Sequence, residues 1–551
     1  MSPQYPARSH AAKVVEELIK LIPEADRGKT HGVFLQASPT LCRDDTDREL
    51  PFHQEANFNY LTGVIHPSCS LVLFFSLSST AQPSNLSHNL FIPPEDPAET
   101  MWSVPPPSIE RASAIYESDK IQHTTTLHAF LQSAVQDAPN VEVILHTLPS
   151  TMEYPALPEI VEKTQGLVRN TDHLFTALHI ARMTKDSSEI ELIRKANQIS
   201  SGAHEVVMRE LGKFARDREA GKGGQKPRTG KESLSQWEIE SEGDAEAVFV
   251  ATCRRMGATQ AYLPIVASGS RASTLHYVCN DRLFPSTSIP RQPGDTSFTP
   301  PQLARGCCGT LTPSHSHETS PTELHTKAFT PQVLLIDAGC EWQGYASDIT
   351  RTIPVGNGGK FTKEAGQIYD LVLKMQKECE ALVQPGIHYD TLHLHAHKVL
   401  IDGFIRLGIF KGDAEEILQS GVTAGFFPHG LGHSLGLDVH DSRQYLKSVH
   451  EAIPDSSKQT PSKLYAYLRI RRPLIEGMVL TIEPGCYFAP QLMEEHGAWS
   501  SQFVNQEVLN KYVGVGGVRI EDVVVVTRDG CENLTTVGRE REWIESACSG
   551  M

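Results

Sequence analysis

Carboxylates stand at the ends of apolar, strand-like runs at several places in the C-terminal half of the chain. Asp337 follows the run 333–336, and Glu483 follows the run 479–482. An ionised carboxylate at such a buried position is costly unless it is paired or coordinated. The chain must therefore adopt a fold that supplies these carboxylates with partners.

Two aspartates, Asp337 and Asp348, lie 11 residues apart, with Gly339 and Gly344 between them. The glycines allow a tight reversal, and a hairpin of this length aims both carboxylates at one point. The alternative is that each aspartate simply faces solvent at a turn.

Three histidines, His429, His433 and His440, alternate with glycines within 12 residues. His429 and His433 resemble the H-x-x-x-H pair of helical zinc peptidases, but Gly430 occupies the position of the glutamate base, and glycines disfavour a helix. In an extended chain the two histidines share one face. A metal or catalytic cluster and a polar loop remain the alternatives.

Two glutamates, Glu483 and Glu521, end or interrupt apolar runs, and an ion pair with Arg519 is the alternative explanation for Glu521. The candidate metal ligands are Asp337, Asp348, His433, Glu483 and Glu521. Four ionised carboxylates share a pocket only if cations neutralise them, and two divalent ions balance their charge. An oxygen-rich set with one imidazole suits Mn²⁺.

The composition is that of a folded protein, with 551 residues, 39% hydrophobic and 21% charged. A net charge of −16 argues against nucleic acid or an anionic membrane as a partner. The apolar stretch 70–75 is too short to span a bilayer, and residues 1–30 contain no apolar run of signal-peptide type. Eleven cysteines without a C-x-x-C motif predict reduced thiols and a cytoplasmic location.

Two domains are expected, residues 1–178 and 179–551. In the first, an amphipathic helix around 14–22 precedes alternating strand and helix patterns, which predict a modest α/β domain. In the second, Asp186 begins a helix that is expected to reach His204. Further helices are expected at 363–383 and 390–407, and strands at 333–336, 479–482 and 518–526.

Two polar segments, about 214–235 and 283–330, lack apolar periodicity and are expected to be surface loops or disordered insertions. A structureless stretch as long as the second is unusual within a domain, so an error in the gene model is an alternative. Peptides covering 305–327 in mass spectra of the native protein would exclude such an error.

The order Asp, Asp, His, Glu, Glu, with these flanking residues, resembles the pita-bread metallopeptidases, the clan of methionine aminopeptidase, aminopeptidase P and prolidase. The three-histidine string resembles the proline-directed branch, as do 265–269 leading to 275–277 and, in the N-terminal half, 51–54 and 58–63. The resemblance implies an α+β fold, with a C-terminal pita-bread (creatinase/aminopeptidase-like) catalytic domain and a smaller N-terminal α/β domain. Ser442 and Arg443 depart from the family pattern, in which glycines usually follow the last histidine.

The resemblance also implies roles for the site residues in hydrolysis of the Xaa-Pro bond. Asp337 would hold one of two Mn²⁺ ions, His433 and Glu483 the other, and Asp348 and Glu521 would bridge the pair. Two such ions lower the pKa of a shared water and so supply a nucleophile at neutral pH. His429 and His440 would steady the substrate carbonyl, His276 would position the prolyl residue, Glu483 would pass a proton to the leaving nitrogen, and Arg519 would orient a ligand carboxylate.

The length of the substrate is left open by the sequence. We expect an Xaa-Pro aminopeptidase acting on peptides with proline in the second position, with a prolidase as the alternative. A prolidase must bind the free carboxylate of a dipeptide, and Arg469, Arg471 and Arg472 are candidates for that contact. A catalytically inactive peptide- or partner-binding protein is a further alternative, and the family resemblance admits a homodimer.

Overall fold

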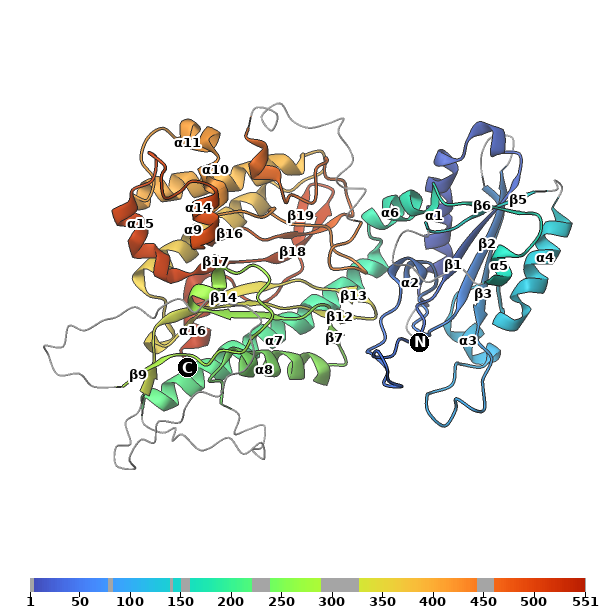
Figure 1. Cartoon of the computed structure of the whole chain (residues 1–551), viewed down its shortest axis with the longest axis horizontal. Helices are drawn as coiled ribbons and strands as arrows, with labels where there is room; N and C mark the ends of the chain where they lie inside the picture. The colour runs from blue at the N-terminus through green and yellow to red at the C-terminus, as the bar shows by residue number, and fades with distance from the viewer. Residues whose placement is uncertain are drawn as a thin grey trace, which may run out of the picture.

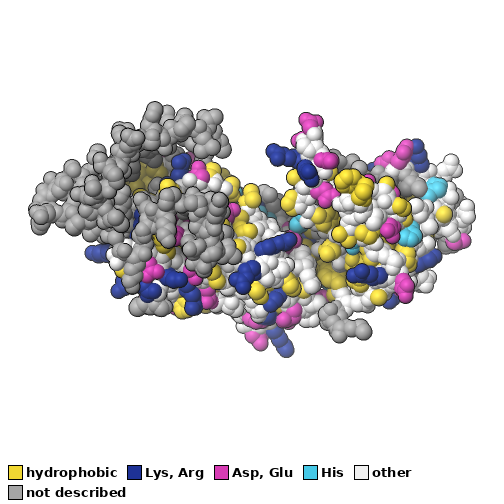
Figure 2. Space-filling model, turned by 90° about the horizontal axis from the view of Figure 1, so that it is seen from below, with side chains coloured by type: hydrophobic (Ala, Val, Ile, Leu, Met, Phe, Trp, Pro, Cys, Tyr) yellow, Lys and Arg dark blue, Asp and Glu magenta, His cyan; other side chains and the backbone are white. Residues whose placement is uncertain are grey.

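The computed structural model describes residues 4–77, 83–138, 142–149, 159–220, 238–288, 327–442 and 460–550. Figure 1 shows two lobes, an N-terminal lobe built on one sheet and a larger C-terminal lobe. No helix within the described ranges is long and apolar enough to cross a bilayer. On the face seen in Figure 2, Lys and Arg side chains are interspersed with Asp and Glu.

The N-terminal lobe is a six-stranded mixed sheet in the order β4-β3-β2-β1-β5-β6. Side chains alternate across it, so that Val33 and Leu35 pack with α1, whereas Phe34 packs with α4. The strands are β1 (Thr30–Gln36), β2 (Ser70–Leu77), β3 (Pro83–Ile92), β4 (Lys120–His123), β5 (Val143–His146) and β6 (Leu167–Asn170). The helices are α1 (Ala7–Leu21), α2 (Ala56–Thr62), α3 (Ile109–Ile115), α4 (Leu127–Asp137), α5 (Glu159–Glu162) and α6 (Leu174–Met183). The predicted α/β pattern of this half is therefore confirmed.

The C-terminal lobe contains short antiparallel sheets, ordered β14-β11-β8, β13-β12-β7 and β15-β18-β19, and the pair β16-β17. Helices α7 and α8 lie on one side of these strands and α9 and α10 on the other (Figure 1). The helices are α7 (Ser187–Glu219), α8 (Glu242–Arg255), α9 (Lys363–Ala381), α10 (Tyr389–Leu407), α11 (Ala414–Ser420), α14 (Pro490–Glu495), α15 (Gln506–Tyr512) and α16 (Arg541–Cys548). The strands are β7 (Thr259–Gln260), β8 (Ile265–Ser268), β9 (Ser286–Ser288), β10 (Lys327–Phe329), β11 (Gln332–Asp337), β12 (Cys340–Trp342), β13 (Tyr345–Ala346), β14 (Thr350–Val355), β15 (Val479–Ile482), β16 (Gly485–Tyr487), β17 (Gly517–Arg519), β18 (Asp522–Thr527) and β19 (Gly530–Asn533).

Helix α7 differs from the prediction at its C-terminal end. It begins as expected, with a capping box at Asp186 and Glu189, but runs to Glu219 instead of ending near His204. Val207, Met208, Leu211 and Ala215 are buried, so the apolar period of the helix continues. The expectation of a loop from residue 214 is therefore wrong for 214–219, and residues 221–237 lie outside the described part.

The second predicted insertion is anchored at both ends. Strands β9 and β10 pair antiparallel, with Thr287 opposite Ala328, so the expectation of a loop or disorder is wrong for 286–288 and 327–329. Residues 289–326 themselves lie outside the described part. The predicted domain boundary at 178/179 falls inside α6, whose Ala177 and Leu178 are buried with α1.

Candidate metal centre and active site

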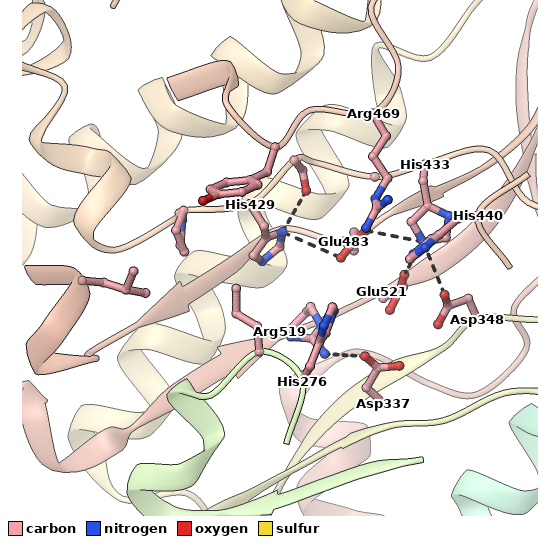
Figure 3. A pocket seen from close by; sticks show the side chains of 16 residues that line it. His276, Asp337, Asp348, His429, His433, His440, Arg469, Glu483, Arg519 and Glu521 are labelled. Atoms are coloured by element: carbon pink, nitrogen blue, oxygen red, sulfur yellow. Dashed lines mark hydrogen bonds and ion pairs between the residues drawn. The ribbon is translucent and has the colours of Figure 1, made fainter. Parts of the chain in front are cut away.

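Ten of the twelve residues that the sequence singled out for chemistry line one cavity of about 390 Å³ in the C-terminal lobe (Figure 3). They are His276, Asp337, Asp348, His429, His433, His440, Arg469, Glu483, Arg519 and Glu521. They come from segments separated by up to 245 residues of chain, since 521 − 276 = 245. The fold therefore brings the candidates together at one place.

The two aspartates meet because β11 pairs with β14, with Asp337 opposite Thr350. The hydroxyl oxygen of Tyr262 lies between the two carboxylates, 2.6 Å from Asp337 Oδ1 and 2.5 Å from Asp348 Oδ1, and its one hydrogen bonds to either. The predicted hairpin is thus present, and a tyrosine fixes the two carboxylates relative to each other. Tyr262 was not predicted, because an isolated tyrosine before a short strand carries no signal of this contact.

The two glutamates meet because β15 pairs with β18, with Ile482 opposite Asp522. Glu521 lies between β17 and β18, so the predicted continuous strand 518–526 is wrong. The chain changes partner there, since β17 pairs with β16 whereas β18 pairs with β15. The break turns Glu521 into the cavity, where its Oε2 accepts a hydrogen bond from Thr350 Oγ1 at 2.7 Å.

His433 is oriented as a metal ligand would be. Its Nδ1 lies 3.1 Å from the carbonyl oxygen of Ser434, so the proton belongs on Nδ1 and the lone pair of Nε2 is available. Nε2 lies 3.3 Å from Asp348 Oδ2, 3.6 Å from Glu483 Oε1 and 3.9 Å from Glu521 Oε1. The backbone of the neighbouring residue 432 lies so close to the carbonyl of Thr481 that only glycine fits, because a Cβ there would collide with that carbonyl.

Three of the four candidate carboxyl groups, those of Asp337, Glu483 and Glu521, are electrostatically unfavourable as anions without cations. Burial, together with repulsion from Asp348 and Glu483, raises the pKa of Glu521 well above its usual range. Burial raises the pKa of Glu483 to about 7, and burial also raises the pKa of Asp337. Asp348, His433 and Glu521 offer ligand atoms within 4.8 Å of one another. This donor set fits divalent cations, which would relieve the repulsion.

Two comparisons with known proteins identify the family. Residues 191–528 match the model of metallopeptidase family M24, and residues 10–144 match the N-terminal domain of aminopeptidase P. The chain belongs to metallopeptidase family M24. The predicted α+β fold, with an N-terminal α/β domain before a pita-bread catalytic domain, is thereby confirmed.

Relatives within M24 match over nearly the full length. A probable Xaa-Pro aminopeptidase of Metarhizium acridum is 36% identical over 98% of this chain and 89% of its own length. A probable Xaa-Pro aminopeptidase of Podospora anserina is 36% identical over 98% of this chain and 97% of its own length. Among solved structures, proline aminopeptidase P II from Yersinia pestis is 25% identical, with a TM-score of 0.68 over 98% of this chain and 99% of that one.

Arg519 of this M24 chain links Asp337, a candidate metal ligand, to His429 through Tyr487. Its Nη2 donates to Asp337 Oδ2 at 2.5 Å and its Nη1 to the hydroxyl of Tyr487 at 2.9 Å. That hydroxyl lies 2.8 Å from His429 Nε2. Arg519 therefore orients Asp337, and the alternative in which it forms an ion pair with Glu521 is not what the structure shows.

His429 is neutral in this arrangement. Burial and the nearby Arg519 lower its pKa to about 3, and its Nδ1 lies 2.8 Å from the carbonyl of Gly430. Nδ1 is therefore the protonated nitrogen, and it also faces Glu483 Oε2 at 3.8 Å. Its single N–H is thus bonded to the Gly430 carbonyl, and it donates to a substrate oxygen only by leaving that carbonyl.

Of the three candidate arginines, Arg469 lines the cavity, whereas Arg471 and Arg472 do not. Arg469 lines the cavity, and Figure 3 shows its guanidinium pointing in beside Glu483 and His440. Arg471 instead donates to Asp390 Oδ2 at 2.6 Å and lies over the ring of Tyr465. Arg471 is thus committed to packing, and Arg469 is better placed to meet a substrate.

The segment that carries His276 is organised by a carboxylate that the sequence did not reveal. Glu242, on the first turn of α8, is fully buried. Its Oε1 accepts from the amide and hydroxyl of Ser268 and from Arg271, and its Oε2 accepts from the Tyr277 hydroxyl at 2.8 Å and the Arg282 amide. One side chain therefore holds both ends of the segment 268–282.

We expect Glu242→Ala to destabilise the protein by about 3–5 kcal/mol, because it leaves Arg271 and several buried donors without a partner. Thermal unfolding measures this loss. Activity at a temperature where the variant is folded should also fall, because His276 is no longer held. Glu210→Ala, at an exposed position of α7, is the control and should change neither property. Wild-type stability of Glu242→Ala would contradict the assignment.

Proposed function

We propose that this M24 peptidase releases the N-terminal residue from peptides whose second residue is proline. The observation that carries the proposal is the convergence of five ligand-type side chains with His276, His429 and His440 on one cavity. The cavity volume, about 390 Å³, suits a few residues of peptide. Full-length similarity to proteins named Xaa-Pro aminopeptidase supports the same activity.

The residue set also supports the metal assignment. Asp337 would hold one cation, His433 and Glu483 the second, and Asp348 and Glu521 both. When bound, two such cations supply an activated water and polarise the scissile carbonyl. The oxygen-rich ligands favour Mn²⁺, which metal analysis of the purified protein would identify.

The side chains of this chain then act on the substrate. Glu483, close to both His429 and His433, is placed to accept a proton and pass it to the leaving prolyl nitrogen. His429 and His440 donate to the substrate carbonyl as charge develops on it, and His276 contacts the prolyl ring. Proline needs such a dedicated site, because its nitrogen carries no hydrogen and its ring fixes the backbone.

The position of Arg469 at the cavity favours a second candidate function, that of a prolidase. A cation directed into the cavity suits the free carboxylate of an Xaa-Pro dipeptide. A non-catalytic binding protein is less well supported, since all five ligand positions are retained. A cytoplasmic location and a homodimer remain predictions from the sequence.

The deciding assay compares Ala-Pro-Leu, Ala-Pro and Ala-Ala-Leu in Mn²⁺-containing buffer. We expect kcat/KM for Ala-Pro-Leu to exceed that for each of the other two peptides by about tenfold or more. Preference for Ala-Pro would instead establish a prolidase, and Arg469→Gln should then selectively raise KM for the dipeptide. Hydrolysis of neither proline peptide by metal-replete protein would refute both assignments.

A further inference from the structure

A buried cluster of ionic side chains lies directly behind His440. Asp441 Oδ1 accepts from Arg182 at 2.5 Å and its Oδ2 from Lys185 at 2.8 Å. The three side chains are each no more than 3% exposed. Arg182 also donates to Asp438 Oδ2 at 2.7 Å. Burying three of these charges gives little net stability compared with an apolar core, so a positional role is the better explanation for their presence.

The cluster fixes the turn that presents His440. The amide of Asp441 donates to the carbonyl of Ser434 at 2.9 Å, and the amide of Gly436 donates to that of Asp438 at 3.0 Å. A Cβ on Gly436 would lie 2.6 Å from Asp441 Oδ2, so this turn requires glycine there. His440 immediately precedes Asp441, and its ring meets the ring of His433 edge-on at 4.4 Å.

The same cluster reaches both the N-terminal lobe and the strand before Glu483. Arg182 donates to Asn57 Oδ1 at 2.7 Å, and Asn57 lies on α2, where its own Nδ2 is held by Glu55 at 2.7 Å. On the other side, the amide of Lys185 donates to the carbonyl of Gly477 at 2.8 Å, two residues before β15 begins. The arginine thus lies between the two lobes.

Helix α2 makes a second contact, with the hairpin that carries the candidate metal ligands Asp337 and Asp348. Gly344 turns the hairpin between Asp337 and Asp348, and a Cβ there would collide with the side-chain amide of Asn59. Asn57 and Asn59 therefore place one helix of the N-terminal lobe against two parts of the site. This is a structural reason for the N-terminal lobe to influence the cavity although none of the described residues of that lobe lines it.

We propose that Arg182 is a positioning residue that holds His440 at the cavity through Asp441, and that α2 of the N-terminal lobe holds Arg182 in turn. The proposal rests on the proposed function only in taking His440 as a substrate contact. Arg182 does not line the cavity and acts through the 438–441 turn. If the cluster only stabilised the fold, its loss would lower the unfolding temperature without a specific effect on turnover by folded protein.

The test is a double-mutant cycle between Arg182 and His440. In the wild-type background, Arg182→Gln should lower kcat for Ala-Pro-Leu by about tenfold with little change in KM, at a temperature where the variant is folded and holds its full metal content. In the His440→Ala background the same substitution should change kcat by less than about twofold. An equal loss in both backgrounds would overturn the proposal.

Asn57→Ala provides a second variant, because it removes the contact from α2 and leaves the ion cluster balanced. We expect a smaller loss of kcat, about threefold, which also disappears in the His440→Ala background. Arg194→Gln is the matched control, since Arg194 lies on α7 and pairs with the exposed Glu532. Full activity of Asn57→Ala would refute the part played by the N-terminal lobe.

A crystal structure of Arg182→Gln separates failure of this proposal from failure of the proposed function. The 438–441 turn should shift and His440 should leave its edge-on contact with His433, whatever peptide the enzyme cleaves. An unmoved His440 would overturn the proposal even if the wild-type protein is an active Xaa-Pro aminopeptidase. If His440 moved but the wild-type protein were inactive on proline peptides, the positioning role of Arg182 would be supported and the assigned activity refuted.

Discussion

Glu483→Gln is expected to lower kcat for an Xaa-Pro peptide by about 10³-fold or more while leaving the protein folded. The substitution keeps the volume of the side chain but removes its charge and its capacity to accept a proton. Glu483 lies 3.6 Å from His433 Nε2 and 3.8 Å from His429 Nδ1, so the proposed metal binding and the proposed proton transfer both depend on it. Steady-state kinetics in Mn²⁺-containing buffer and metal analysis measure the two effects.

Glu494→Gln is the matched control for this substitution. Glu494 is exposed on α14, whose Leu492 lines the cavity, so it shares the neighbourhood of the site without entering it. Its activity should stay within about twofold of wild type. If Glu483→Gln kept more than a tenth of wild-type activity with two metal equivalents bound, the role assigned to Glu483 would be wrong.

Removal of metal is expected to abolish activity and to make stability fall as the pH rises. In the folded, metal-free protein burial raises the pKa of Glu483 from 4.5 to about 7, and burial raises the pKa of Glu521 well above its usual range. A carboxyl whose pKa is raised on folding stabilises the protein while it is protonated, and that contribution is lost as pH rises through the folded pKa. The chelated protein should therefore unfold at a lower temperature at pH 8 than at pH 5.

Added Mn²⁺ should reverse this loss at pH 8, because the cations replace the protons that the carboxyl groups would otherwise require. The stabilisation should be about 2.7 kcal/mol per site when free Mn²⁺ is 100 times its Kd. Thermal unfolding at pH 5, 6.5 and 8, with and without Mn²⁺, measures both effects. An unfolding temperature of the chelated protein that is equal or higher at pH 8 would contradict the electrostatic account of the site.

The sequence predicted individual elements well wherever burial follows a local period. Helix α9, expected at 363–383, spans Lys363–Ala381, and strand β15 has the expected bounds, Val479–Ile482. Prediction failed where tertiary contacts decide the outcome. The strand expected at 518–526 is broken at Glu521 because its two halves pair with different strands, which no local pattern records.

The candidate site shows the same division between local and distant information. The sequence pattern predicts Asp337, Glu483 and Glu521 as site residues because charged residues in apolar runs need partners. The contacts of these residues could not be predicted from the sequence, because their partners lie far away along the chain. Tyr262 precedes Asp337 by 75 residues and Arg182 precedes Asp441 by 259, and both contacts depend on how the sheets and lobes pack.

The carboxylates that end apolar runs by themselves predicted bound divalent cations and named the candidate ligands. Charge burial is a local energetic demand, so composition and spacing suffice to reveal it. Only the tertiary structure decided how the demand is met: which strands pair to bring the aspartates and glutamates together, that Arg519 turns to Asp337, and that the N-terminal lobe reaches the site through Arg182. Those contacts depend on side-chain positions set by the whole packed core, which no single segment specifies.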